Sequence, residues 1–129
     1  MKEYAIRLHK GDDLKENIEN ICANIQSAVV LCAVGCISHL HLRMAKAVNY
    51  LDIENDYEIL SLTGTISNGK AHLHMAVSDE NGNCVGGHLE KGCIINTTCE
   101  LILGILEEYE SNRVFDPTTG YSEIEFRKK

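Results

Sequence analysis

Two hairpin turn sequences stand close together in the middle of this 129-residue chain and constrain its fold more than any other feature. The first, Asn68-Gly69, is a strong signal for a two-residue hairpin because both residues tolerate positive φ. The second, residues 79–82, combines Asp, Glu, Asn and Gly in the manner of a longer turn. The alternating segments that these turns join are residues 57–66, 71–77 and 83–89. The sequence therefore predicts an antiparallel meander through the middle of the chain.

Three of the six histidines, His72, His74 and His88, fall on this meander. His72 and His74 are separated by one residue, so their side chains point the same way from a strand. Folding the second hairpin brings His88 opposite His74 or one residue away, and an even offset places all three imidazoles on one face. Three neutral nitrogen ligands with a fourth position open are typical of a first-row metal site. We predict such a site here, and the alternative is three ordinary polar residues on a solvated face.

The flanking segments predict one helix and further strands. Asp13 and Glu16 have capping-box spacing, and apolar residues recur at helical intervals, which predicts an amphipathic helix over residues 13–26. A continuous apolar run indicates a buried strand that we expect to end at Gly35. Residues 48–56, rich in Asn and Asp, are expected to form a loop. Other strand segments are expected at residues 1–8, 28–35, 37–47, 93–95 and 99–103, with a short closing strand over residues 121–126.

These elements predict an α+β fold with a mostly antiparallel or mixed sheet of six or seven strands and one main helix packed on it. The chain is 44% hydrophobic, which is enough for a core of ordinary size. We therefore expect residues 1–129 to form a single domain.

Composition also narrows the classes of function. The chain has 12 Lys and Arg against 19 Asp and Glu, a net charge of -7, whereas binding to nucleic acid depends on basic residues that displace counterions. We therefore do not expect direct DNA binding by the isolated chain. No apolar run has the length of a membrane span. The chain has six cysteines and opens on a strand-like segment instead of a secretion signal, so we expect a cytoplasmic protein with reduced thiols.

Three stretches together resemble one known family: residues 57–64 (YEILSLTG), 72–74 (HLH) and 85–93 (VGGHLEKGC). They are similar to the plant- and prokaryote-conserved (PPC) domain in its stand-alone bacterial and archaeal form, and the likeness covers nearly the whole chain. The resemblance implies a compact α+β homotrimer with zinc bound by His72, His74 and His88. Plant relatives are nuclear DNA-binding proteins in which the domain is joined to a basic AT-hook, and this chain contains no such segment.

Three functions remain open at this point. The first is a trimeric zinc-binding module for a small anionic or carbonyl-bearing ligand, with Arg43 as an anchor if its strand faces the site. The second is a zinc-dependent lyase acting on a 2-hydroxy or 2-oxo acid, because the fold resembles that of acetolactate decarboxylase, which also binds zinc through three histidines. The third is a regulatory or DNA-binding protein like the plant relatives, which would require a basic surface created by trimerisation or a basic protein partner.

The remaining polar candidates are less specific. A lyase needs a general acid or base near the metal, and the nearest carboxylates in sequence are Glu58, Asp79 and Glu90. His39 and His41 form a second His-x-His pair, either on a solvated strand edge or in the lining of the same cavity.

Overall fold

The computed structural model of the chain describes residues 1–129 and contains eight strands and one helix. In chain order, the elements are β1 (Lys2–His9), α1 (Leu14–Ile21), β2 (Ser27–Arg43), β3 (Tyr50–Ser67), β4 (Lys70–Ser78), β5 (Cys84–Leu89), β6 (Ile94–Ile105), β7 (Tyr109–Asp116) and β8 (Tyr121–Lys128).

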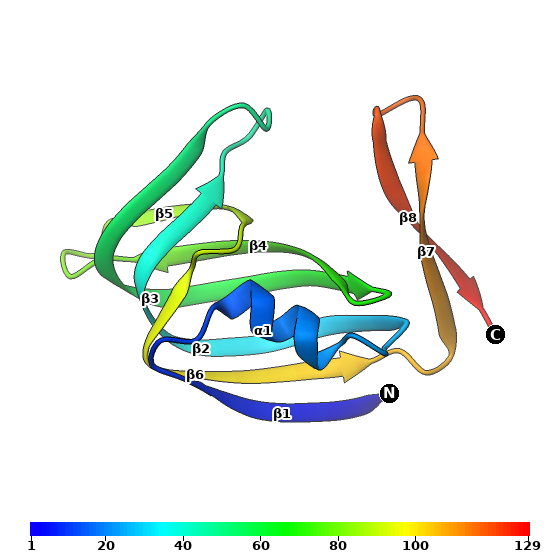
Figure 1. The fold of residues 1–129 in the computed structure, drawn as a ribbon, viewed down its shortest axis with the longest axis horizontal. Helices are drawn as coiled ribbons and strands as arrows, with labels where there is room; N and C mark the ends of the chain where they lie inside the picture. Colours follow the sequence, from blue (N-terminus) through cyan, green and yellow to red (C-terminus); the bar gives the residue numbers. More distant parts are fainter.

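Six of the strands form one antiparallel sheet in the order β1-β6-β2-β3-β4-β5. The end of β2 also pairs with β5, so the strands from β2 to β5 close on themselves. The last two strands, β7 and β8, form a separate hairpin that stands beside the main sheet (Figure 1). The α+β prediction is confirmed, and the sheet is antiparallel throughout. The final strand does not close the main sheet as expected, because it pairs with β7 alone.

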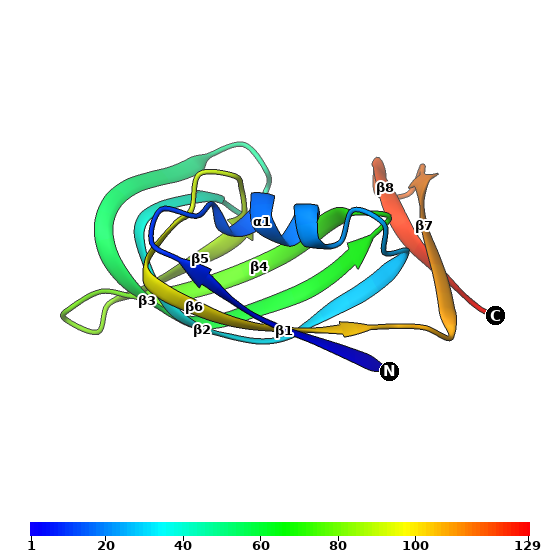
Figure 2. The ribbon, with the colours of Figure 1, turned by 60° about the horizontal axis from the view of Figure 1, so that its bottom comes forward.

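The sheet curves around α1, which lies against its inner face (Figure 2). Leu14 and Ile18, one helical turn apart, are fully buried in a core of 22 residues. Asp13 caps the helix, and its carboxylate accepts a hydrogen bond from the Glu16 amide at 3.0 Å, as the capping-box spacing predicts. The helix is shorter than predicted, because Cys22 leaves helical geometry and the chain then turns into β2.

Two predicted breaks are wrong. The apolar strand does not end at Gly35 but continues to Arg43, and glycine is needed there for close approach: a Cβ on Gly35 would lie 2.1 Å from the Thr98 carbonyl oxygen of β6. The loop predicted over residues 48–56 is limited to its first two residues, because β3 begins at Tyr50 and residues 50–56 belong to this strand. Their backbone pairs with β2 while the acidic side chains stay exposed, so tertiary pairing outweighs the turn-like composition. Similarly, residues 93–95 and 99–103 belong mostly to one long strand, β6.

All six cysteines are free thiols, and Cys22, Cys93 and Cys99 are buried. Burial raises the pKa of Cys93 and that of Cys99 to about 11, so both remain protonated at neutral pH. These two residues therefore act as small apolar side chains of the core. No helix of the chain is both long and apolar enough to cross a membrane.

Candidate metal centre

The alternation of β4 separates its apolar side chains from its two histidines. Leu73, Met75 and Val77 are buried in the core, whereas His72 and His74 project from the opposite face of the sheet and are exposed. This pattern is the period-two alternation of a half-buried strand. The local sequence HLHMAV therefore fixes the face on which both imidazoles stand.

Strand pairing then brings two more polar residues to the same face. His88 on β5 lies directly opposite His74 on β4, and Arg43 on β2 lies directly opposite His88. Directly opposed residues of an antiparallel pair share a face. His74, His88 and Arg43 therefore form a row across three strands. This row depends on the closure of β2 onto β5.

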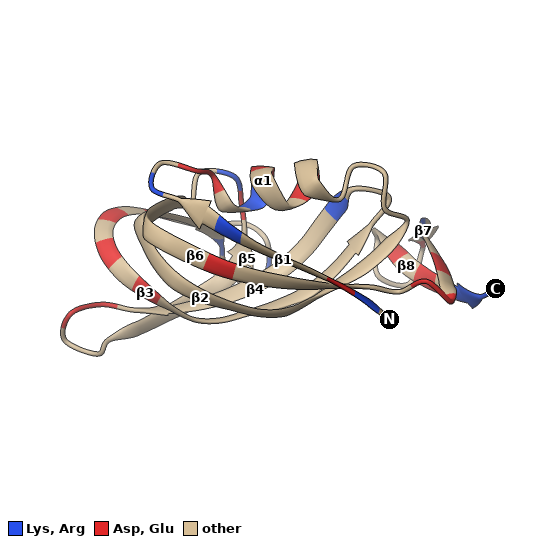
Figure 3. Ribbon diagram, turned by 90° about the horizontal axis from the view of Figure 1, so that it is seen from below, with Lys and Arg blue, Asp and Glu red and all other residues tan.

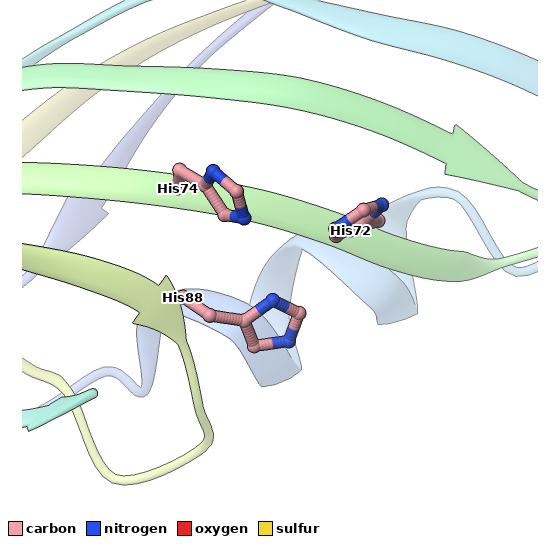
Figure 4. A group of neighbouring side chains, drawn as sticks. All are labelled: His72, His74 and His88. Atoms are coloured by element: carbon pink, nitrogen blue, oxygen red, sulfur yellow. The ribbon is translucent and has the colours of Figure 1, made fainter. Parts of the chain in front are cut away.

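The three imidazoles converge from β4 and β5 (Figure 4). Their ring centroids are 5.2 to 5.6 Å apart, and one nitrogen from each ring lies within 4.8 Å of the other two. Nitrogens around a tetrahedral zinc at about 2.1 Å are roughly 3.4 Å apart, so small side-chain rotations would bring the cluster to that geometry. His88 Nδ1 is buried and has no hydrogen-bond partner. The donor set and this unpaired nitrogen both fit a zinc ion.

Burial and nearby cations lower the pKa of two of the three histidines, His72 and His88. Burial lowers the pKa of His88 to about 4, and the nearby Arg43 guanidinium adds to the effect. The pKa of His72 is also lowered, first by burial and then by the charge of Arg113. Both imidazoles are therefore unprotonated at pH 7, which is the form that binds a metal ion.

The cluster forms part of a pocket of about 790 Å³. Arg43 lines this pocket, as expected if its strand faces the site. The segment that follows β2 adds Lys46, and the β7–β8 hairpin supplies one wall. The residues of that wall are Arg113, Tyr121, Ser122 and Glu123.

The other sequence candidates lie elsewhere. His39 is paired with Asp52 and lies 3.8 Å from a Glu54 oxygen, and His41 Nδ1 donates to the Lys91 carbonyl at 2.6 Å. Neither lines the pocket, so the second His-x-His pair forms surface contacts. The three candidate carboxylates are also absent from the pocket lining, and two of them line a separate acidic hollow of about 230 Å³. Those two are Glu58 and Asp79.

Sequence reasoning missed the whole contribution of the hairpin. Arg113 and Glu123 are far from the histidines in the chain, and no motif or spacing links them to the meander. The one available signal was the charge at every second position from Glu123 to Arg127, which predicts a strand but not its position.

Fold and site together define a small antiparallel α+β domain with a three-histidine cluster on the outer face of its sheet. The chain belongs to the Plants and Prokaryotes Conserved (PCC) domain family, also written PPC, whose model matches residues 1–107. This finding confirms the resemblance noted in the sequence.

Several individual proteins are similar to the chain. A bifunctional protein GlmU from Synechococcus sp. (strain JA-3-3Ab) is 39% identical over 99% of the chain, which spans only 21% of that relative's length. A hypothetical protein from Salmonella enterica is 29% identical, with a TM-score of 0.95 over 99% of this chain and 94% of that one. A metal-containing protein from Archaeoglobus fulgidus is 28% identical, with a TM-score of 0.76 over 95% and 92% of the two chains.

Proposed function

We propose that the chain is a homotrimeric zinc-binding module that holds a small anionic or carbonyl-bearing ligand at its metal. The observation that carries this proposal is the convergence of three imidazoles inside a pocket that also contains Arg43, Lys46 and Arg113. His72, His74 and His88 would hold the ion. A bound zinc with three protein ligands keeps a position for a ligand and polarises a carbonyl as a Lewis acid.

A solved structure of similar fold supports the proposal that the site binds a metal ion. The Archaeoglobus fulgidus protein is described as containing a metal, and it aligns with 95% of this chain. The basic side chains of the pocket support the proposal that its ligand is an anion, because guanidinium groups pair with carboxylates through charge-assisted hydrogen bonds. A metal ion would increase the positive charge of the same pocket.

An apolar patch supports the trimer. Leu31, Val34 and Leu60 are 45%, 56% and 55% exposed on neighbouring strands β2 and β3. Large apolar side chains grouped on a surface indicate an interface. Strand pairing places His72 of β4 opposite Thr65 of β3, and Thr65 opposite Val29 of β2. The histidines therefore lie on the same outer face of the sheet as the apolar patch.

We expect sedimentation equilibrium to give a mass of three chains of 14.3 kDa each. The variant Val34→Asp, which places a charge in the apolar patch, should shift the protein toward the single-chain mass. A Lys10→Asp variant outside the patch should remain assembled. A single-chain mass for the wild type would contradict the trimer.

Ligand binding at the metal is tested by thermal unfolding with pyruvate as the probe. Pyruvate should stabilise the zinc-loaded protein and leave the chelated protein unchanged, because its carboxylate and carbonyl need the ion. Arg43→Gln should weaken the stabilisation, whereas Lys10→Gln, an exposed cation outside the pocket, should not. Equal stabilisation of the metal-free protein would place the ligand away from the metal and contradict the proposal.

A second candidate, the zinc-dependent lyase, is favoured by one observation. Glu123 lines the pocket and is its one carboxylate, so it could act as the general acid or base that such a reaction needs. Turnover of a 2-hydroxy-2-acyl acid that is abolished by chelation and by Glu123→Gln would support the lyase. Zinc binding without turnover would contradict the lyase and favour the non-catalytic binding module.

The charge distribution does not favour the third candidate, a DNA-binding protein. Exposed acidic residues follow one another along the curved part of β3 (Figure 3), and they are Asp52, Glu54, Asp56 and Glu58. Three of the twelve Lys and Arg residues line the pocket of the histidine cluster, whose volume of about 790 Å³ suits a small molecule.

A further inference from the structure

The β7–β8 hairpin is held against the main sheet at one point. Ser111 is fully buried, its hydroxyl donates to the Gln26 carbonyl at 3.0 Å, and it is hydrogen-bonded to the Ser67 hydroxyl at 2.8 Å. Asn68 Nδ2 donates to the Ser111 carbonyl at 3.0 Å. Because Asn68 belongs to the turn that leads into β4, these bonds fix the start of β7 beside the strand that carries His72.

Arg113 follows this anchor by two residues and faces the pocket without a partner. Its Nη2 atom is buried and makes no hydrogen bond. The ion pairs of the chain involve His39, Lys91 and Arg127, so the guanidinium of Arg113 has no carboxylate within 4.0 Å, and neither does that of Arg43. A buried charged donor without a partner is unfavourable unless an anion binds it. Arg113 therefore has an unused capacity to bind an acidic group.

The two arginines approach different members of the histidine cluster. Arg43 lies opposite His88 in the strand register, and among charged groups it has the largest effect on the pKa of His88. Arg113 comes from β7 and lines the same pocket as His72, and its charge lowers the pKa of His72 more than the charge of Arg43 does. The pocket that holds the histidine cluster thus contains two cations from different parts of the fold, Arg43 from β2 and Arg113 from β7.

We propose that the pocket selects a short dicarboxylic 2-oxo acid. Its oxo-acid end would bind at the ion beside Arg43, and its distal carboxylate would bind the guanidinium of Arg113. The planar fork of an arginine matches a carboxylate in this way, and a pocket of about 790 Å³ has room for a five-carbon diacid. This inference rests on the proposed function, since it assigns the ligand of the same metal site.

The experiment compares 2-oxoglutarate with 2-oxopentanoate, which has the same chain length but lacks the distal carboxylate. Isothermal titration calorimetry on zinc-loaded protein, with metal content measured in each sample, gives both affinities. The wild type should bind 2-oxoglutarate about tenfold or more tightly than 2-oxopentanoate, as expected for one charge-assisted pair. Arg113→Gln should remove this preference and leave the affinity for 2-oxopentanoate unchanged.

Lys128→Gln provides the matched control, because Lys128 is an exposed cation of the same hairpin outside the pocket. It should retain the wild-type preference. Equal affinities of the metal-loaded wild type for the two acids would overturn the assignment of the ligand alone. Equal loss of both affinities in Arg113→Gln would also overturn it. Absence of bound metal in the wild type would instead overturn the proposed function, and the assignment with it.

Discussion

The double variant His72→Ala/His74→Ala should lose the bound zinc, while the wild type should contain about one zinc ion per chain. The loss should be nearly complete, because a single remaining imidazole, His88, cannot hold the ion at the three-nitrogen site. Plasma emission spectroscopy on untagged protein measures the metal directly. In the same samples, chelation should lower the unfolding temperature of the wild type and leave that of the variant unchanged, because only the metal-loaded state gains binding free energy.

The matched control is His39→Ala/His41→Ala, which also removes a His-x-His pair from a strand. These histidines contact Asp52 and the Lys91 carbonyl and lie outside the pocket, so this variant should retain the metal. If zinc persisted in the His72→Ala/His74→Ala protein, the two histidines would be ordinary polar surface residues and not metal ligands. A non-catalytic interaction role would then become the leading account.

Gly64→Ala should strongly destabilise the fold. Gly64 has a φ of 143°, and a Cβ there would lie 2.0 Å from the His72 carbonyl oxygen and 2.9 Å from Leu73 Cα. Because β3 and β4 cannot pair at their present distance with that atom between them, we expect a loss of roughly 3 kcal/mol or more in the free energy of unfolding. Urea denaturation followed by circular dichroism measures this loss.

Gly82→Ala separates the steric effect from the backbone effect. Gly82 also has a positive φ, of 80°, but a Cβ there would meet no atom within 4 Å. Its cost should therefore be only about 1 kcal/mol, the penalty of a left-handed conformation for an L-residue. Equal free energies of unfolding for the two alanine variants would contradict the close approach of β3 and β4 at Gly64.

The part of the site that lies on adjacent hairpins could be predicted from the sequence. Alternation fixes the face of His72 and His74, and the turn residues before and after β4 fix the order of pairing. The offset that places His88 opposite His74 was one of two alternatives in the sequence, and the structure has that one. Local patterns were sufficient here because each contact joins neighbours in the chain.

The remainder of the site depends on contacts between distant segments. Arg43 reaches the cluster because β2 closes onto β5, and Arg113 reaches it because a buried serine anchors the last hairpin. Neither contact leaves a periodic or motif signal in the sequence. The extension of β3 through residues 50–56 was missed for a similar reason, since its partner strand, and not its own composition, determines its conformation.

The position of the β7–β8 hairpin at the end of the chain separates two properties of the pocket. The three histidines lie within residues 1–107, which match the family, whereas the wall that contains Arg113 and Glu123 begins at Tyr109. Exchange of these last twenty or so residues leaves every proposed metal ligand in place. A protein with the same sheet and a different last hairpin would keep the proposed metal ligands and present a different wall to the bound compound, so the two parts of the pocket can change independently.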